Sequence, residues 1–248
     1  MTRRRFIAAL PAALNQGRIL PSAVSSLELD LLHGAEKIAW TDVARPITFG
    51  SLLKPFLALA FAKTHSRFPT LRCRGAGDRC WLPQGHGKQD IVAALANSCN
   101  CYFLSLANGI DRAALDEISL SYELALPSRS LDAAGLIGLG PGWFNSPLAV
   151  ARAFAQLGQN RSLRAGISQA VLTGMERCAA YGTARNVHLP CYAKTGTAPC
   201  SHLPRATGDG FVAVIYPRDQ PRLVLLLQRH GTTGAEACRD VRGRIDLP

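Results

Sequence analysis

The chain has 248 residues, and its 28 lysines and arginines against 17 aspartates and glutamates give a formal net charge of +11. A hydrophobic content of 48% and a charged content of 18% exclude a disordered chain, and the length allows one or two domains with a full core. No apolar run approaches 18 residues, which excludes a membrane-spanning helix, and the scattered basic residues argue against a nucleic-acid partner.

The N-terminus is first basic and then apolar. Three arginines at positions 3–5 precede the apolar residues 6–14, an order that resembles an export signal with a twin-arginine pattern. We therefore expect residues 1–18 to be an export signal or a basic tail, and residues 19–248 to form one folded domain. After export, that domain would lie in the periplasm or the cell envelope.

The next part of the chain mixes strand-like and helical segments. Residues 27–32 and 37–40 read as strands, and residues 51–63 carry apolar residues at helical spacing. Residues 65–88 are rich in cysteine, glycine and proline, which predicts a loop. Further helices are expected over residues 89–97, 101–108, 111–118, 147–157 and 166–180.

The last part of the chain is rich in strands. Residues 191–198, 210–216 and 222–229 read as strands, and the proline-containing segment between the last two predicts a hairpin turn. An amphipathic helix is expected over residues 234–244. This order predicts an α+β fold: one antiparallel sheet, built from both ends of the chain and covered by helices, with an all-helical insertion at about residues 60–185.

The chain has eight cysteines, an even number that suits an oxidising compartment. Cys73 and Cys80 flank a glycine-rich segment, and Cys191 and Cys200 flank a second segment, so two disulfides are one interpretation. Reduced cysteines acting as small hydrophobic residues are the alternative. No Cys-x-x-Cys pair occurs and the histidines lack zinc-finger spacing, so we expect no metal.

Lysine is rare, because five of the 28 basic residues are lysines. Each lysine is therefore a candidate for chemistry that arginine cannot perform. Ser51 and Lys54 are three residues apart at the start of a predicted helix and share one face of it. A desolvated Lys54 would take the proton of Ser51 and make it a nucleophile. The alternative is a surface serine beside a solvated lysine.

Two further motifs place polar residues at the ends of predicted elements. Ser98-Cys99-Asn100 follows a predicted helix and offers a hydroxyl for proton relay and an amide for binding; a capped turn between helices is the alternative. Lys194-Thr195-Gly196-Thr197 lies in a predicted strand. Its glycine indicates close approach by another backbone, which we expect to be a substrate lying along the strand; an edge strand protected by a lysine is the alternative.

Together the three motifs resemble those of the penicillin-recognising serine acyltransferases, which include the penicillin-binding proteins and the serine β-lactamases. The order Ser-x-x-Lys, Ser-x-Asn, Lys-Thr-Gly is the same, and residues 50–56 (Gly-Ser-Leu-Leu-Lys-Pro-Phe) are similar to the first motif of penicillin-binding transpeptidases. Residues 85–103 resemble the helix and loop before their second motif, and residues 182–184 (Gly-Thr-Ala) are typical before the third. The resemblance extends from about residue 45 to about residue 245.

The resemblance implies a transpeptidase-like domain that forms an acyl-enzyme with peptidoglycan stem peptides ending in D-Ala-D-Ala. Ser51 would be the nucleophile, Lys54 the base, and Ser98 the relay of a proton to the leaving amine. The substrate would be bound by Asn100, Lys194, Thr195, Gly196 and Thr197, with the backbone N–H groups of Ser51 and Thr197 as the oxyanion hole. No metal or organic cofactor is implied, β-lactams would act as inhibitors, and other cell-wall synthesis proteins are implied partners.

The acceptor of the acyl group distinguishes the related activities. An amine acceptor gives a D,D-transpeptidase, whereas water gives a D,D-carboxypeptidase or a β-lactamase. The sequence has no Glu-x-x-Leu-Asn deacylation signature, and the context of the first motif favours the transpeptidase. The alternative from another class is a non-catalytic relative that keeps the cleft as a peptide-binding module.

Overall fold

A computed structural model describes residues 24–140, 142–200 and 206–245. The predicted export signal or tail at residues 1–18 lies outside the described residues. Within them, no helix has the length and apolar character needed to cross a bilayer.

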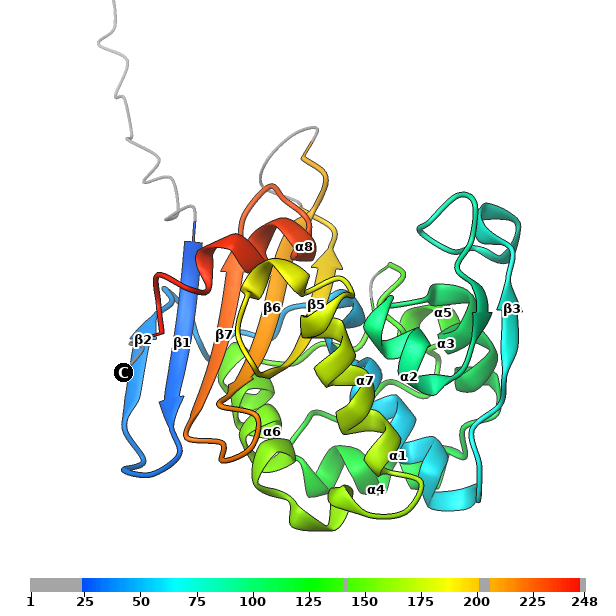
Figure 1. Ribbon diagram of the computed structural model, residues 1–248, viewed down its shortest axis with the longest axis horizontal. Helices are drawn as coiled ribbons and strands as arrows, with labels where there is room; N and C mark the ends of the chain where they lie inside the picture. The colour runs from blue at the N-terminus through cyan, green and yellow to red at the C-terminus, as the bar shows by residue number, and fades with distance from the viewer. Residues whose placement is uncertain (1–23, 141, 201–205, 246–248) are drawn as a thin grey trace, which may run out of the picture.

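Five antiparallel strands form the main sheet, in the order β2-β1-β7-β6-β5. They are β1 (Val24–Asp30), β2 (Glu36–Ala39), β5 (Tyr192–Ala198), β6 (Asp209–Tyr216) and β7 (Leu223–Arg229). The sheet therefore combines strands from both ends of the described chain, and β5 is an edge strand facing the helical part (Figure 1). The predicted α+β fold is confirmed.

Helices occupy the segment between the two groups of strands. They are α1 (Lys54–Thr64), α2 (Ile91–Ala96), α3 (Asn100–Asn108), α4 (Arg112–Ser121), α5 (Ala133–Leu136), α6 (Pro147–Gln159) and α7 (Gln169–Ala180), and α8 (Gly234–Ala237) follows the last strand. Several begin at a side-chain cap: Asp90, Asp111 and Ser146 accept hydrogen bonds from the first turns of α2, α4 and α6. Such caps satisfy backbone N–H groups that have no partner within the helix.

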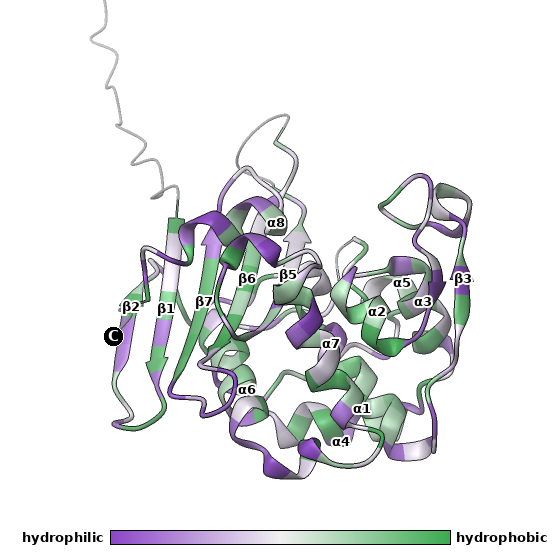
Figure 2. Cartoon of the chain, viewed as in Figure 1, coloured by the Kyte–Doolittle hydropathy of each residue, from purple (hydrophilic) through white to green (hydrophobic). Residues whose placement is uncertain are grey.

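Both faces of the sheet are covered, which explains the character of its central strands. Phe211, Ala213 and Ile215 of β6 belong to the large core shared with the helices, whereas Val212 and Val214 belong to a second core with the end of α7 and with α8. Strands buried on both faces read as continuous apolar runs, and β6 and β7 are hydrophobic along most of their lengths (Figure 2).

Three segments differ from the sequence-based expectation. The predicted loop at residues 65–88 contains a two-stranded sheet of β3 (Leu71–Cys73) and β4 (Gly87–Gln89). The predicted helix over 234–244 is one turn of α8 followed by the 3₁₀ turn Cys238–Asp240. The apolar residues that predicted it still line the second core, because a series of turns places them against the sheet as a helix would. The short helix α5 was not predicted.

Candidate active site

A cavity of about 350 Å³ lies between the edge strand β5 and the helical part of the molecule. Its lining includes six of the eight residues predicted for the site: Ser51, Ser98, Asn100, Thr195, Gly196 and Thr197. The two remaining residues, Lys54 and Lys194, have no solvent exposure and are hydrogen-bonded to the Ser98 segment. The fold thus brings all three sequence motifs to one place.

Ser51 lies in the 3₁₀ turn Gly50–Leu53, which leads directly into α1. Gly50 has a φ of +56°, and a Cβ atom there would lie 2.1 Å from the carbonyl oxygen of Thr197. A side chain is therefore excluded at position 50 by both conformation and contact. The absence of a side chain at position 50 allows the turn that contains Ser51 to lie against β5.

Gly196 provides the matching surface on β5. A Cβ atom at this position would lie 2.1 Å from the carbonyl oxygen of Phe49. The close backbone approach predicted from this glycine is present, but the approaching backbone is the chain's own segment before Ser51. Gly196 thus joins the first and third motifs.

Lys54 lies beneath the cavity and is held by the second motif. Its Nζ donates hydrogen bonds to Asn100 Oδ1 (2.7 Å) and to the carbonyl oxygen of Ser98 (3.1 Å). Burial, followed by the positive charge of Lys194, holds the pKa of Lys54 well below its usual range. A hydrogen bond from Lys54 to Ser51 is absent from this structure, so the second motif, rather than Ser51, orients the amine.

Lys194 approaches the same segment from β5. Its Nζ donates to Ser98 Oγ (2.8 Å) and to the carbonyl oxygen of Thr195 (2.8 Å). Burial lowers its pKa to about 8. Because Lys194 donates to Ser98 Oγ, the hydroxyl proton of Ser98 is available to another acceptor.

Ser98 connects α2 to α3 in an uncommon conformation. Its φ is +51°, in the left-handed region that non-glycine residues rarely adopt. This turn directs the Ser98 carbonyl to Lys54 and its hydroxyl to Lys194. The Asn100 carboxamide oxygen is occupied by Lys54, so its nitrogen is the atom that can donate to a substrate carbonyl.

The threonines of β5 are fixed by the segments that cover the sheet. Thr195 Oγ1 and Thr183 Oγ1 share a hydrogen bond of 2.6 Å, which gives a structural reason for the Gly-Thr-Ala triplet before the third motif. Thr197 Oγ1 accepts a hydrogen bond from the backbone N–H of Gly234 (3.0 Å). Five lining residues were not predicted from the sequence, because no motif marks them: Trp81, Gly138, Leu139, Thr233 and Ala235.

The cysteines do not form the two disulfides considered from the sequence. Cys73, Cys80 and Cys191 are free thiols, so neither Cys73–Cys80 nor Cys191–Cys200 is bonded in this structure. Instead, Cys73 and Cys80 lie with His86 and Cys99 in a group whose ligand atoms are all within 4.8 Å of one another. The expectation of no metal rested on the spacing of cysteines and histidines along the chain. Because folding brings these distant residues together, their spacing is no argument against a metal site.

The sequence matches no family model and no curated protein. The fold, by contrast, is that of the transpeptidase domains of penicillin-binding proteins. The structure of the penicillin-binding protein PBP2 from Helicobacter pylori, alone and in complex with MreC, aligns with TM-scores of 0.70 and 0.71 at 16% and 15% identity. These alignments cover 86% and 89% of this chain but 57% and 59% of that protein, so the chain spans less than two thirds of its length.

Two other solved structures show the same likeness. The TP domain of penicillin-binding protein 3 from Burkholderia pseudomallei aligns with a TM-score of 0.66 at 15% identity, covering 88% of this chain and 85% of that domain. A ceftriaxone acyl-enzyme complex of penicillin-binding protein A from M. tuberculosis aligns with a TM-score of 0.66 at 15% identity, covering 89% and 72%.

Proposed function

We propose that this protein is a penicillin-binding serine acyltransferase that forms an acyl-enzyme on Ser51. The observation that carries the proposal is the pair of buried lysines that hold the Ser98–Asn100 turn beside the cavity containing Ser51. A merely structural turn would not require two buried lysines, because burying a group that is charged in water is costly. The likeness to transpeptidase domains supports the same activity.

Acylation begins at the nucleophile. Ser51 Oγ attacks the carbonyl carbon of the terminal peptide bond, or of a β-lactam, and its proton passes to the neutral amine of Lys54. The negative charge that develops on the carbonyl oxygen is stabilised by the backbone N–H groups of Ser51 and Thr197. The contact between Gly50 and the Thr197 backbone supports this pairing, because it sets the two segments side by side.

Breaking the C–N bond requires a proton at the leaving nitrogen. Ser98 Oγ donates that proton, and Lys194, which donates to the same oxygen at 2.8 Å, replaces it. In deacylation the incoming water or amine loses a proton, which passes through Ser98 to Lys194. Lys54 gives the proton that it took during acylation back to Ser51 Oγ. Each lysine thus regains its starting state after one cycle.

The polar groups of the cleft support a peptide substrate with a terminal carboxylate. Asn100 offers its carboxamide nitrogen to the backbone of the acyl donor, and Thr195, Thr197 and the Lys194 charge favour a terminal carboxylate. We assign peptidoglycan stem peptides ending in D-Ala-D-Ala as substrates and β-lactams as inhibitors. The protein would act in the periplasm or cell envelope.

We infer an amine as the acyl acceptor, which makes the protein a D,D-transpeptidase. Its structural neighbours are transpeptidase domains, and one of them was solved with MreC. A partner among cell-wall synthesis proteins is therefore part of the proposal. D,D-carboxypeptidase activity is the second candidate, since the same acyl-enzyme reacts with water when no amine is bound.

The base is tested by Lys54→Arg, which keeps the charge but cannot accept a proton at neutral pH. Acylation by penicillin should slow by a factor of about 100 to 10,000, the usual effect of removing a positioned general base. Lys63→Arg is the matched control, since Lys63 lies in the same helix and is exposed and ion-paired with Glu117. Its acylation rate should equal that of the wild type.

Lys54→Met separates a folding defect from a chemical one, because it fills a similar volume without a charge to bury. Circular dichroism would establish that each variant is folded. Folded Lys54 variants that acylate at the wild-type rate would remove Lys54 from its proposed role.

A further inference from the structure

Three cysteines and one histidine meet beside the candidate active site. Cys73 ends β3, Cys80 and His86 lie in the following loop, and Cys99 directly precedes α3. All three cysteines are buried, with exposures of 3%, 7% and 0%. The group contains no acidic residue, and none of its members is used in the proposed acyl transfer.

The distances within the group fit a tetrahedral metal ion. Cys80 Sγ lies 3.9 Å from Cys99 Sγ and 3.4 Å from His86 Nδ1, which lies 3.7 Å from Cys73 Sγ. A tetrahedral zinc ion, with Zn–S bonds of about 2.3 Å and a Zn–N bond of about 2.0 Å, separates its ligand atoms by about 3.5–3.8 Å. At 3.9 Å, the sulfur atoms of Cys80 and Cys99 are also too far apart to be a disulfide, whose sulfur atoms lie about 2.05 Å apart.

The backbone of the loop is shaped to bring these ligands together. Gly75 and Gly85 have φ values of +89° and +80°. A Cβ atom at Gly75 would lie 1.9 Å from the carbonyl oxygen of Pro83, and one at Gly85 would lie 2.4 Å from the carbonyl oxygen of Cys73, so neither position has room for a side chain. Arg79, directly before Cys80, is also left-handed, with a φ of +58°. These conformations are uncommon outside tight turns and fix the direction of the ligands.

We propose that Cys73, Cys80, His86 and Cys99 bind one zinc ion. Three thiols would lose their protons to solvent on binding, and the histidine would bind through neutral Nδ1, which leaves a net charge of −1. Four protein ligands close the coordination sphere, so the ion is structural and has no open position for catalysis.

The site would tie the loop to the second motif. Cys99 lies between Ser98 and Asn100, the two residues that hold Lys54 and Lys194. Trp81, next to Cys80, lines the active-site cavity and donates from Nε1 to the Asn97 carbonyl oxygen. Zinc would therefore position Ser98, the proposed proton relay, and one wall of the cavity. This positioning effect rests on the proposed function, whereas the proposal of the metal site does not rest on it.

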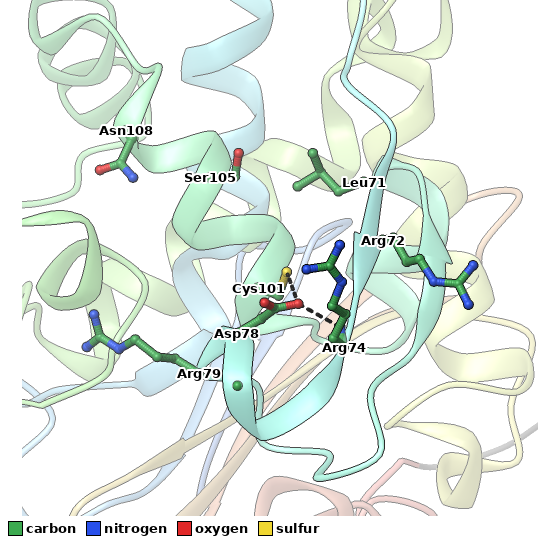
Figure 3. A pocket seen from close by; sticks show the side chains of 9 residues that line it. Leu71, Arg72, Arg74, Asp78, Arg79, Cys101, Ser105 and Asn108 are labelled. Atoms are coloured by element: carbon green, nitrogen blue, oxygen red, sulfur yellow. Dashed lines mark hydrogen bonds between the residues drawn. The ribbon is translucent and has the colours of Figure 1, made fainter.

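A second group of possible ligands lies beside the first and shares Cys73. It contains Asp78 and Cys101. In Figure 3 dashed lines join Asp78 to the thiol of Cys101 and to the backbone of Arg74: its Oδ2 accepts from the Arg74 backbone N–H (2.6 Å) and from Cys101 Sγ (3.6 Å). Asp78 is thus occupied in holding the turn. This group has three members, one fewer than a closed zinc site requires.

The metal is tested by zinc content and by cobalt substitution in the full chain. Wild-type protein, dialysed against buffered zinc, should retain one zinc per chain, and Co²⁺ should give the visible absorption of thiolate coordination. In Cys99→Ser and His86→Gln the zinc affinity should fall by at least about 10–100-fold. This is the loss that follows when a residue hydrogen-bonded to a metal ligand is changed, and removing a ligand itself should cost no less. Cys101→Ser is the matched control and should retain zinc.

His86→Gln changes a half-buried loop residue and keeps the test informative if Cys99→Ser does not fold. Wild-type protein without zinc, or equal retention by wild type and both ligand variants, would overturn the proposal. Loss of zinc from Cys101→Ser with retention in Cys99→Ser would also overturn it, in favour of the second group. An intact mass lower by two hydrogens, with a Cys80–Cys99 disulfide and no metal, would do the same.

The positioning effect has a readout that does not depend on activity. Removing zinc with a chelator should accelerate hydrogen exchange in the peptide covering residues 98–103, and adding zinc should reverse this. Unchanged exchange would show that the ion does not hold the second motif. Absence of penicillin acylation with zinc bound would contradict the proposed function and leave the metal site intact.

Discussion

Two lysines without solvent exposure approach Ser98 from different elements, and their different partners suit them to different roles in the proposed mechanism. Lys54 is hydrogen-bonded to two acceptor oxygens, and its pKa is depressed by burial and by Lys194. Lys194 also lies in a buried environment, but its pKa falls only to about 8. In the proposed mechanism the lowered pKa of Lys54 suits it to act as the base, while Lys194, which keeps its proton below about pH 8, acts as the proton donor.

A pH dependence of acylation follows from this division. Lys194 holds its proton below about pH 8 and loses it above. Because the proposed mechanism protonates the leaving nitrogen through Ser98 from Lys194, the acylation rate should fall as the pH rises through about 8. The measurement is the rate of labelling by a fluorescent penicillin between pH 6 and 10, with circular dichroism to confirm the fold at each pH. A rate that does not change between pH 7 and 9.5 would exclude Lys194 as the donor.

At the scale of elements, the site depends on contacts between backbones that only glycine allows. The turn containing Ser51 lies against β5 through Gly50 and Gly196, each of which faces the backbone of the other segment. This contact sets the separation between Ser51 and β5.

Gly196→Ala should therefore disturb both stability and acylation. The added Cβ would meet the Phe49 carbonyl oxygen at 2.1 Å, and such overpacking costs about 1–3 kcal/mol. Gly243→Ala is the control, because it has no atom within 4 Å of the added Cβ. Urea unfolding should show lower stability, and penicillin labelling a lower rate, for Gly196→Ala alone. Equal stability of the two variants would show that the contact is easily relaxed.

The sequence allowed prediction of those parts of the site that lie within short motifs. Local sequence patterns predict the order of strands and helices. They also predict that Ser51 lies at the start of a helical segment and Lys194 in a strand, and the structure has both. The contact expected between Ser51 and Lys54 from helical spacing is replaced by a hydrogen bond to Asn100, which depends on how α1 packs against α3. The cysteine–histidine group was missed because its members come from separate segments at irregular spacing.

At the scale of the whole molecule, the charge of +11 is carried mainly by arginine. We predict that the protein binds anionic cell-envelope polymers through this charge, without a specific site. Its retention on purified cell walls should fall as salt rises, because the Debye length shortens from about 10 Å at 0.1 M to about 3 Å at 1 M. Retention that is the same at both salt concentrations would contradict this prediction.

The whole account depends on an acyl-enzyme at Ser51. The most direct measurement is covalent labelling with a fluorescent penicillin, comparing wild type with Ser51→Ala by denaturing gel and intact mass. We predict one penicilloyl adduct per chain in the wild type and none in Ser51→Ala. A folded wild-type protein that neither forms the adduct nor hydrolyses penicillin would contradict the account and favour a non-catalytic peptide-binding protein.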